Sequence, residues 1–348
     1  MATHRSRLRR LVAVLTVTSA LVLAGCANNS SGPATGADAM TLNVGQTSNS
    51  AAFFPLFVAE NQGYFKEEGL TLGERPRLGT GAKLAAALQS GSIDVAAGVM
   101  TDAFNLHRIN KKTRVIGSLV GQYYVDVVVG SSFPTSNDAK PLAQRITALK
   151  GKKIGITGPG SGTEALLTYL LKKQNLDPKT DVTLVNLGSD ASAALGALKT
   201  GRVDALSFFQ PIGEQAVANG IGRIYISPAR GDVPELSGTL HGAMFTTQTV
   251  LDRKGKAVDA FYRAIDKAEA LIHGSPTTVE ALLQKYQTTM NTNAVKAMVP
   301  VLQAEIPANA APTEAGYDKS VTFHKETGLV TDAPSFGDMV LKLPVSTS

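Results

Sequence analysis

The chain has 348 residues, which is enough for two lobes with sizeable cores, and 43% of them are hydrophobic, as in ordinary soluble proteins. The formal net charge is +6, but four arginines fall within the first 25 residues, which contain no acidic residue. The rest of the chain is therefore near +2, and the charge does not indicate a nucleic-acid partner. The single cysteine, Cys26, excludes a disulfide within the chain and a metal cluster built from cysteines.

The amino terminus has the three parts of a bacterial secretory signal. A basic segment from Arg5 to Arg10 precedes an apolar run from Leu11 to Leu23, which is shorter than the ~20 apolar residues of a membrane span. The closing residues, Leu23-Ala24-Gly25-Cys26, resemble a lipobox, in which a peptidase cuts before the cysteine and the thiol is lipidated. We predict a signal peptide over residues 1–25 and lipidation of Cys26; the alternative is an ordinary signal peptide with a chance cysteine.

Residues 26–39 are small and polar, so they cannot bury a core and are typical of a flexible tether. The folded part is expected to begin near Met40. This arrangement predicts an exported protein, lipid-anchored at the outer face of the cell membrane or on the periplasmic side, with the membrane reached through the lipid.

An internal repeat organises the remainder of the chain. Residues 87–97 and 197–207 match at an offset of 110, which relates Gly91 to Gly201 and Asp94 to Asp204. The same offset relates residues 45 and 47 to residues 155 and 157, so we predict two copies of one α/β unit. Each glycine suits the left-handed position after a helix. The two aspartates are interpreted as turn and capping residues in preference to ligand contacts.

In each copy, strands alternate with helices, which predicts a mainly parallel sheet. Ligands of such sheets lie at the carboxyl ends of the strands, here residues 46–50, 79–81 and 100–102 in the first lobe. In the second lobe a glycine-rich loop, residues 157–163, follows a strand and opens a helix. It lacks the lysine of a phosphate loop and the dinucleotide spacing. Its backbone N–H groups suit an anion or a polar group, and the alternative is a tight turn.

The predicted fold class is α/β, with two lobes and two hinge crossings. The first lobe comprises residues 40–122 and 243–348, and the second comprises residues 123–242. The strand at 242–247 is expected to pair antiparallel with the segment at 123–129, so that two crossing segments form a hinge. Helices beginning near residues 292 and 313 are expected to cover the first lobe.

Positive evidence for catalysis is absent from the sequence. The mature chain has no second cysteine to act as a nucleophile, its histidines have no metal-ligand spacing, and there is no nucleophile elbow. We therefore predict a protein that is not an enzyme and needs neither cofactor nor metal. An exported enzyme that uses Asp102 or His241 is the alternative.

Three segments carry a family resemblance: residues 54–70, the two repeat copies, and residues 149–155. With these segments the chain resembles the extracytoplasmic solute-binding proteins of ABC importers, in the nitrate/sulfonate/taurine (NMT1/THI5-like) branch. The resemblance implies a type II periplasmic-binding-protein fold, a small solute held between the lobes, and delivery to an ABC permease and its ATPase. It also implies a monomer.

Mapped onto the strand ends, the resemblance suggests a set of ligand-binding residues. They are Ser48, Asn49, Ser50, Phe53, Thr80, Gly81, Thr101, Asp102, Tyr123, Tyr124, Ser161, Gly162, Thr163, Ser189 and Gln210. Hydroxyl and N–H groups suit an oxyanion such as a sulfonate, nitrate or taurine, while the aromatic rings suit a flat portion. A buried Asp102 would repel an anion, so it fits either a ligand amine or, as we favour here, a helix cap. A pyrimidine or aromatic solute, and a subunit that signals to a membrane kinase, are the remaining alternatives.

Overall fold

The computed structural model describes residues 39–343, which fall within one compact unit, Pro33–Ser348. The predicted signal peptide, the predicted lipidation site Cys26 and nearly all of the predicted tether lie outside the described residues. Within the described part of the chain, no helix combines the length and the apolar character needed to cross a membrane.

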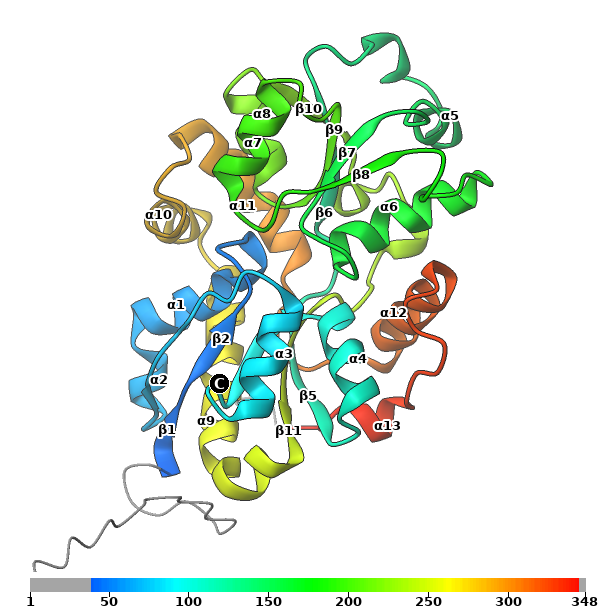
Figure 1. Ribbon diagram of the computed structural model, residues 1–348. Coiled ribbons are helices and arrows are strands. Elements are labelled where there is room, and N and C mark those ends of the chain that lie inside the picture. The colour runs from blue at the N-terminus through cyan, green and yellow to red at the C-terminus, as the bar shows by residue number, and fades with distance from the viewer. Residues whose placement is uncertain (1–38, 344–348) are drawn as a thin grey trace, which may run out of the picture. The chain divides into compact units, whose positions relative to one another are not determined.

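The first lobe is built on a four-stranded sheet in the order β2-β4-β11-β5. Figure 1 labels β2, β11 and β5 among these strands. Its strands are β2 (Val44–Gln46), β4 (Val95–Val99), β5 (Thr113–Val120) and β11 (Gly242–Thr247), and a short parallel pair, β1 (Thr41–Leu42) and β3 (Thr71–Leu72), accompanies it. The helices of this part are α1 (Phe54–Gln62), α2 (Tyr64–Glu67), α3 (Gly81–Ser90), α4 (Met100–Ile109) and α9 (Gln248–Ile272). Strands β2 and β4 run parallel, but β11 runs antiparallel to both of its neighbours, so the prediction of a mainly parallel sheet is wrong for this lobe.

The second lobe is built on a five-stranded sheet in the order β10-β6-β9-β7-β8. Its strands are β6 (Val125–Gly130), β7 (Lys153–Ile156), β8 (Thr183–Asn186), β9 (Ala205–Phe209) and β10 (Gly222–Ile226). Its helices are α5 (Leu142–Thr147), α6 (Gly162–Lys173), α7 (Ala191–Lys199) and α8 (Ile212–Ala218). The expected pairing of residues 242–247 with residues 123–129 is wrong, because β9 and β10 occupy both edges of β6 and β11 lies between β4 and β5.

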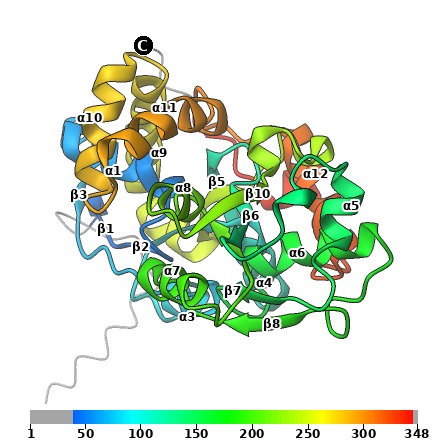
Figure 2. The same cartoon turned by 90° about the horizontal axis from the view of Figure 1, so that it is seen from above.

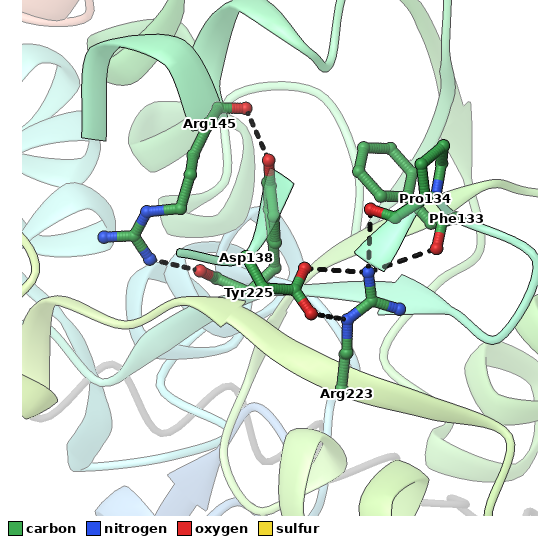
Figure 3. Close-up of polar contacts among 6 residues, drawn as sticks. All are labelled: Phe133, Pro134, Asp138, Arg145, Arg223 and Tyr225. Atoms are coloured by element: carbon green, nitrogen blue, oxygen red, sulfur yellow. Dashed lines mark hydrogen bonds and ion pairs between the residues drawn. The ribbon is translucent and has the colours of Figure 1, made fainter. Parts of the chain in front are cut away.

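Two arginines fasten the outer edge of the second lobe (Figure 3). Arg223 on β10 forms a bidentate pair with Asp138, with N–O distances of 2.6 and 2.8 Å, and donates to the carbonyl oxygen of Phe133 at 3.1 Å. Arg145 on α5 donates to the backbone oxygen of Tyr225 at 2.6 Å, and the tyrosine hydroxyl donates back to the Arg145 oxygen at 3.1 Å. These bonds hold the 133–138 loop and α5 against the edge strand.

The structure reproduces the repeat down to the strand register. Val44 pairs with Val95 in the first sheet, and Ile154 pairs with Ala205 in the second. Both residues of the second pair lie 110 positions after their counterparts in the first pair. The next pairs along, Gly45 with Ala96 and Gly155 with Leu206, keep the same displacement. Each lobe therefore presents its central strand ends in the same way.

The repeated aspartates occupy equivalent turns. Asp94 accepts a hydrogen bond from the backbone N–H of Asn43 at 2.9 Å, and Asp204 accepts one from Lys153 at 2.8 Å. Gly91 has a φ of 77° and Gly201 a φ of 70°, the left-handed conformation that glycine adopts at low cost. Both aspartates thus join the start of one strand to the start of the next, in agreement with the capping interpretation.

The carboxy-terminal helices are α10 (Pro276–Tyr286), α11 (Thr292–Glu305), α12 (Glu314–Thr327) and α13 (Phe336–Met339). Helices α10 and α13 pack on first-lobe elements, whereas α11 and α12 reach the second lobe. Helix α11 packs against α8 and against the 3₁₀ helix η4 (Pro228–Arg230), and α12 packs against α6 (Figure 2). Phe323 of α12 lies in the core of the second lobe, where its ring is 5.1 Å from that of Tyr169. The expectation that α11 and α12 cover the first lobe is wrong in part, because both helices also pack against second-lobe helices, although Tyr317 of α12 contacts Phe104 of α4.

Candidate functional site

A cavity of about 490 Å³ lies where residues of both lobes meet. The first lobe contributes the loop after β2 (residues 47–48), the start of α3 (residues 79–82), and the end of β4. The second lobe contributes the glycine-rich loop (residues 157–163), Ser189 and the end of β9. The cavity thus occupies the carboxyl ends of the strands, as expected for sheets of this kind.

Two helices direct their amino termini at this cavity. Helix α3 is capped by Thr80, whose hydroxyl oxygen accepts from the Lys83 N–H, and α6 is capped by Ser161, which accepts from the Glu164 N–H, both at 3.3 Å. Thr80 and Ser161 line the cavity. The dipole of each helix therefore places positive potential at the cavity wall.

The glycine-rich loop is braced by its own side chains. The hydroxyl oxygen of Thr163 accepts from the Thr157 N–H at 3.0 Å and lies 2.8 Å from the hydroxyl of Ser161. Gly160 has a φ of 73°, which requires glycine or a strained residue. The loop is therefore a tight turn that also forms part of the cavity wall.

Asp102 is a buried residue near the start of α4 that also lines the cavity. Its Oδ2 atom accepts the backbone N–H of Val99 at 3.2 Å, so it has the capping role favoured from the sequence. Burial raises the pKa of Asp102 to about 6, and the Val99 N–H opposes that rise. Its Oδ1 atom lies so close to α3 that a Cβ built on Gly81 would be 1.7 Å away, so glycine is required at residue 81.

His241, the residue before β11, is fully buried and lines the cavity. Its ring stacks on Tyr123 with the centroids 3.8 Å apart. Both ring nitrogens lack a hydrogen-bond partner among the described residues. Burial, with a further contribution from His324, lowers the pKa of His241 well below 6.5, so the imidazole is neutral at pH 7.

Nine of the sequence-predicted ligand-binding residues line the cavity. They are Ser48, Thr80, Gly81, Asp102, Tyr124, Ser161, Gly162, Thr163 and Ser189. The other six, Asn49, Ser50, Phe53, Thr101, Tyr123 and Gln210, do not line it. Asn105 and Arg108 on α4 also line the cavity, and the sequence did not point to either of them. His241 lines it as well, although the sequence did not suggest it as a ligand contact.

The six residues outside the cavity wall have other surroundings. Phe53 belongs to the hydrophobic core, the Thr101 hydroxyl lies 2.8 Å from Nε2 of His324, and the Tyr123 hydroxyl donates to the Gly162 oxygen at 2.6 Å. Asn49 donates to the backbone oxygen of Tyr286 at 3.5 Å. Ser50 and Gln210 are completely buried.

Metal ligands do not cluster in this site. Between residues 39 and 343, no group of three or more His, Cys, Asp or Glu side chains is placed to hold a metal ion.

Comparison with known proteins identifies the family. A model of the NMT1-like family matches residues 36–285, which is most of the chain. The chain belongs to the NMT1-like family. The NMT1-like chain is also 24% identical over 259 residues to YtlA of Bacillus subtilis (strain 168), whose name describes it as a candidate binding protein, and the match covers 71% of each protein. The family predicted from the sequence is thereby confirmed.

Solved structures share the fold of this NMT1-like protein. The ligand-binding component of an ABC-type import system from Staphylococcus aureus, solved with zinc, matches with a TM-score of 0.69 at 14% identity, covering 87% of this chain and 96% of that one. The alkanesulfonate-binding protein SsuA from Xanthomonas axonopodis pv. citri matches with a TM-score of 0.68 at 19% identity, covering 87% of this chain and 98% of that one. The nitrate-binding protein NrtA from Synechocystis PCC 6803 matches with a TM-score of 0.67 at 15% identity, covering 84% of this chain and 82% of that one. The predicted two-lobed α/β periplasmic-binding-protein fold is confirmed.

Proposed function

We propose that this chain is the extracytoplasmic solute-binding component of an ABC importer, which closes on a small solute and delivers it to a permease and its ATPase. The observation that carries the proposal is the cavity, because each lobe contributes equivalent strand ends to it. A cavity of about 490 Å³ is within the range that holds a small ligand. The fold relatives from S. aureus, X. axonopodis and Synechocystis support a receptor of this class.

The solute that we propose is a sulfonate, nitrate, taurine or related organic anion. The helix amino termini at Thr80 and Ser161 support an anionic group, since they present backbone donors and positive potential. Tyr124 and Phe209 line the same cavity and would suit an apolar or flat portion, so a pyrimidine or aromatic solute is the alternative.

Titration calorimetry provides the test. A panel of sulfonates, nitrate, taurine, aromatic acids and pyrimidines should contain one tight binder, and that compound should raise the melting temperature by mass action. At 100 times its Kd a ligand adds about 2.7 kcal/mol to the free energy of unfolding. Failure of the whole panel to bind would refute the receptor function.

We further propose that Cys26 carries the lipid anchor, that the protein is a monomer, and that the two lobes, each built on its own sheet, move against one another. Support for the anchor comes from the Leu23-Ala24-Gly25-Cys26 sequence. Mass spectrometry of the membrane-extracted protein should find diacylglyceryl on Cys26, and Cys26→Ser should release the protein from the membrane. Processing at another residue would contradict the anchor.

An exported enzyme is the second candidate function. The observation in its favour is that Asp102, with a pKa of about 6, and a neutral His241 line one cavity, as an acid–base pair would. The fold is also that of a DSZB mutant solved with biphenyl-2-sulfinic acid, at a TM-score of 0.55 and 16% identity. Product formation that disappears in both Asp102→Ala and His241→Ala would support it, whereas binding without turnover would reject it.

A further inference from the structure

The carboxylate of Asp102 has one oxygen free for a ligand. Its Oδ2 atom accepts the Val99 N–H, while no hydrogen bond or ion pair to Oδ1 is found among the described residues. The residue as a whole is only 7% exposed, and it lines the cavity. The pKa of Asp102 is raised by burial, and no neighbouring cation opposes that rise. A carboxylate in this state lacks the partner that buried charges normally have.

Other charged groups do not neutralise this carboxylate. Among the residues that line the cavity, Asp102 and Arg108 alone have side chains that are formally charged at pH 7. Arg108 is two turns further along α4, and its side chain is exposed. A simple inorganic anion beside Asp102 would therefore meet a like charge, which weakens binding by roughly 10- to 100-fold at distances of about 6–8 Å. A solute that brings its own positive charge avoids this loss.

His241 supplies a second, independent sign of an absent partner. The side chain is completely buried, it lines the same cavity, and neither ring nitrogen is hydrogen-bonded within residues 39–343. A neutral imidazole has one donor and one acceptor, and leaving both unpaired in a buried position is unfavourable. Its Cε1 atom would be 3.3 Å from a Cβ on Gly162, so the ring lies at the amino terminus of α6.

We propose that Asp102 determines the specificity of the cavity by pairing with a protonated nitrogen on the solute, so that the preferred solutes are amino-bearing organic anions. This inference rests on the proposed solute-binding function and narrows its ligand class. The amino group binds Oδ1 of Asp102 on the first lobe. The anionic group binds where the amino terminus of α6 and His241 meet.

Matched pairs of compounds test this assignment. Calorimetry at pH 7.5 compares 3-aminopropanesulfonate with propanesulfonate, and 4-aminomethylbenzoate with 4-methylbenzoate, so that each pair differs by one amino group. In at least one pair, the amino member should bind about 10- to 100-fold more tightly, the range for a hydrogen bond between charged groups. Asp102→Asn keeps the shape and an oxygen for the Val99 N–H, and it should reduce this ratio to about one.

The pH dependence in the wild-type protein gives a second measurement that needs no variant. Pairing with a cation needs the ionised carboxylate, so affinity for the amino member should fall as pH drops through about 6. If a protonated Asp102 instead donated to an oxyanion, affinity would rise over the same range. Burial raises the pKa of Tyr123 and Tyr124, which face Asp102, and lowers that of His241 well below 6.5, so these groups stay neutral above pH 6. Arg108 stays charged throughout, and the sulfonate does not titrate.

The outcomes separate this inference from the function on which it rests. If propanesulfonate or 4-methylbenzoate binds at least as tightly as its amino partner, or if Asp102→Asn leaves the ratio unchanged, the assignment of Asp102 is overturned and the receptor function stands. If affinity rises on acidification, the carboxylate is a donor and the assignment is likewise overturned. If no member of either pair binds, the assignment is rejected. The receptor function fails as well only if the wider panel of nitrate, taurine and pyrimidines also gives no binder.

Discussion

The duplicated aspartates provide a comparison within one molecule. Asp94 and Asp204 make the same backbone hydrogen bond, at 2.9 and 2.8 Å, but Asp94 also pairs with Lys254, whose Nζ lies 2.9 Å from its Oδ2. The side chains of this pair are 10% and 13% exposed. Asp94→Ala and Asp204→Ala should therefore differ in stability by the contribution of the ion pair.

The magnitude follows from these contacts. Loss of one hydrogen bond to a charged acceptor costs about 1.5 kcal/mol where it is partly exposed, which is our expectation for Asp204→Ala. Breaking a buried ion pair costs about 3–5 kcal/mol when one partner stays buried and unpaired. Lys254 keeps a hydrogen bond to the Thr41 oxygen at 3.0 Å, so we take a smaller loss. The total for Asp94→Ala is then about 3.5 kcal/mol, roughly 2 kcal/mol more than for Asp204→Ala.

Urea unfolding at pH 7, followed by far-UV circular dichroism because the chain has no tryptophan, measures both losses. The exposed Asp252→Ala serves as a control, since its side chain accepts only from Gln248 on the same helix. Adding Lys254→Met to each variant completes the comparison: it should cost little in the Asp94→Ala background and more in the Asp204→Ala background. Equal losses in the two single variants would refute the reasoning.

Three further predictions concern polar side chains. Burial raises the pKa of Asp126 to about 8, so the folded protein keeps a proton that the unfolded chain releases, and stability should fall by about 1 kcal/mol per pH unit between pH 6.5 and 8. Urea titrations of Asp126→Asn should show a shallower slope, the remainder coming from Glu269 and Glu305, whose pKa values burial also raises. Burial lowers the pKa of His324 to about 4, so stability gained above pH 6.5 should be lost as pH falls toward 4, and His324→Gln should show a shallower loss in the same titration. Thr101→Val and Thr80→Val should each destabilise by about 1 kcal/mol, but calorimetry should find solute affinity lowered, by about tenfold, in Thr80→Val alone, because Thr101 bonds His324 outside the cavity; equal affinities would contradict the assignment of the cavity wall.

The repeat could be predicted because its signals are local. A glycine after each helix and an aspartate before each strand, at Gly91 and Asp94 and again 110 positions later, reflect backbone requirements that hold wherever the unit is placed. The position of β11 could not be predicted in this way. Its apolar sequence fits any antiparallel edge, and its place between β4 and β5 depends on β6 being already paired on both sides.

The candidate site divides in the same way. Residues that cap helices or end strands, such as Thr80 and Ser161, were found from the sequence because cap chemistry fixes where they point. Tyr123 and Tyr124 are adjacent aromatic residues, yet only the second lines the cavity, since the first turns its hydroxyl toward Gly162. His241 has no local pattern that marks it. Its place depends on stacking against Tyr123 across the two chain segments that connect the lobes.

The shared register of the two sheets places several pairs of equivalent residues on the cavity wall. Thr47 and Thr157 are equivalent under the 110-residue offset, as are Val99 and Phe209, and all four line the cavity. Asp102 has no such counterpart on the wall, because the same offset leads to Ile212, which is buried in the core and does not line the cavity. A wall made only of such matched pairs would accept a solute in either of two reversed poses. With one carboxylate on one side, the cavity distinguishes the head of a solute from its tail, so every captured molecule would be held in a single orientation.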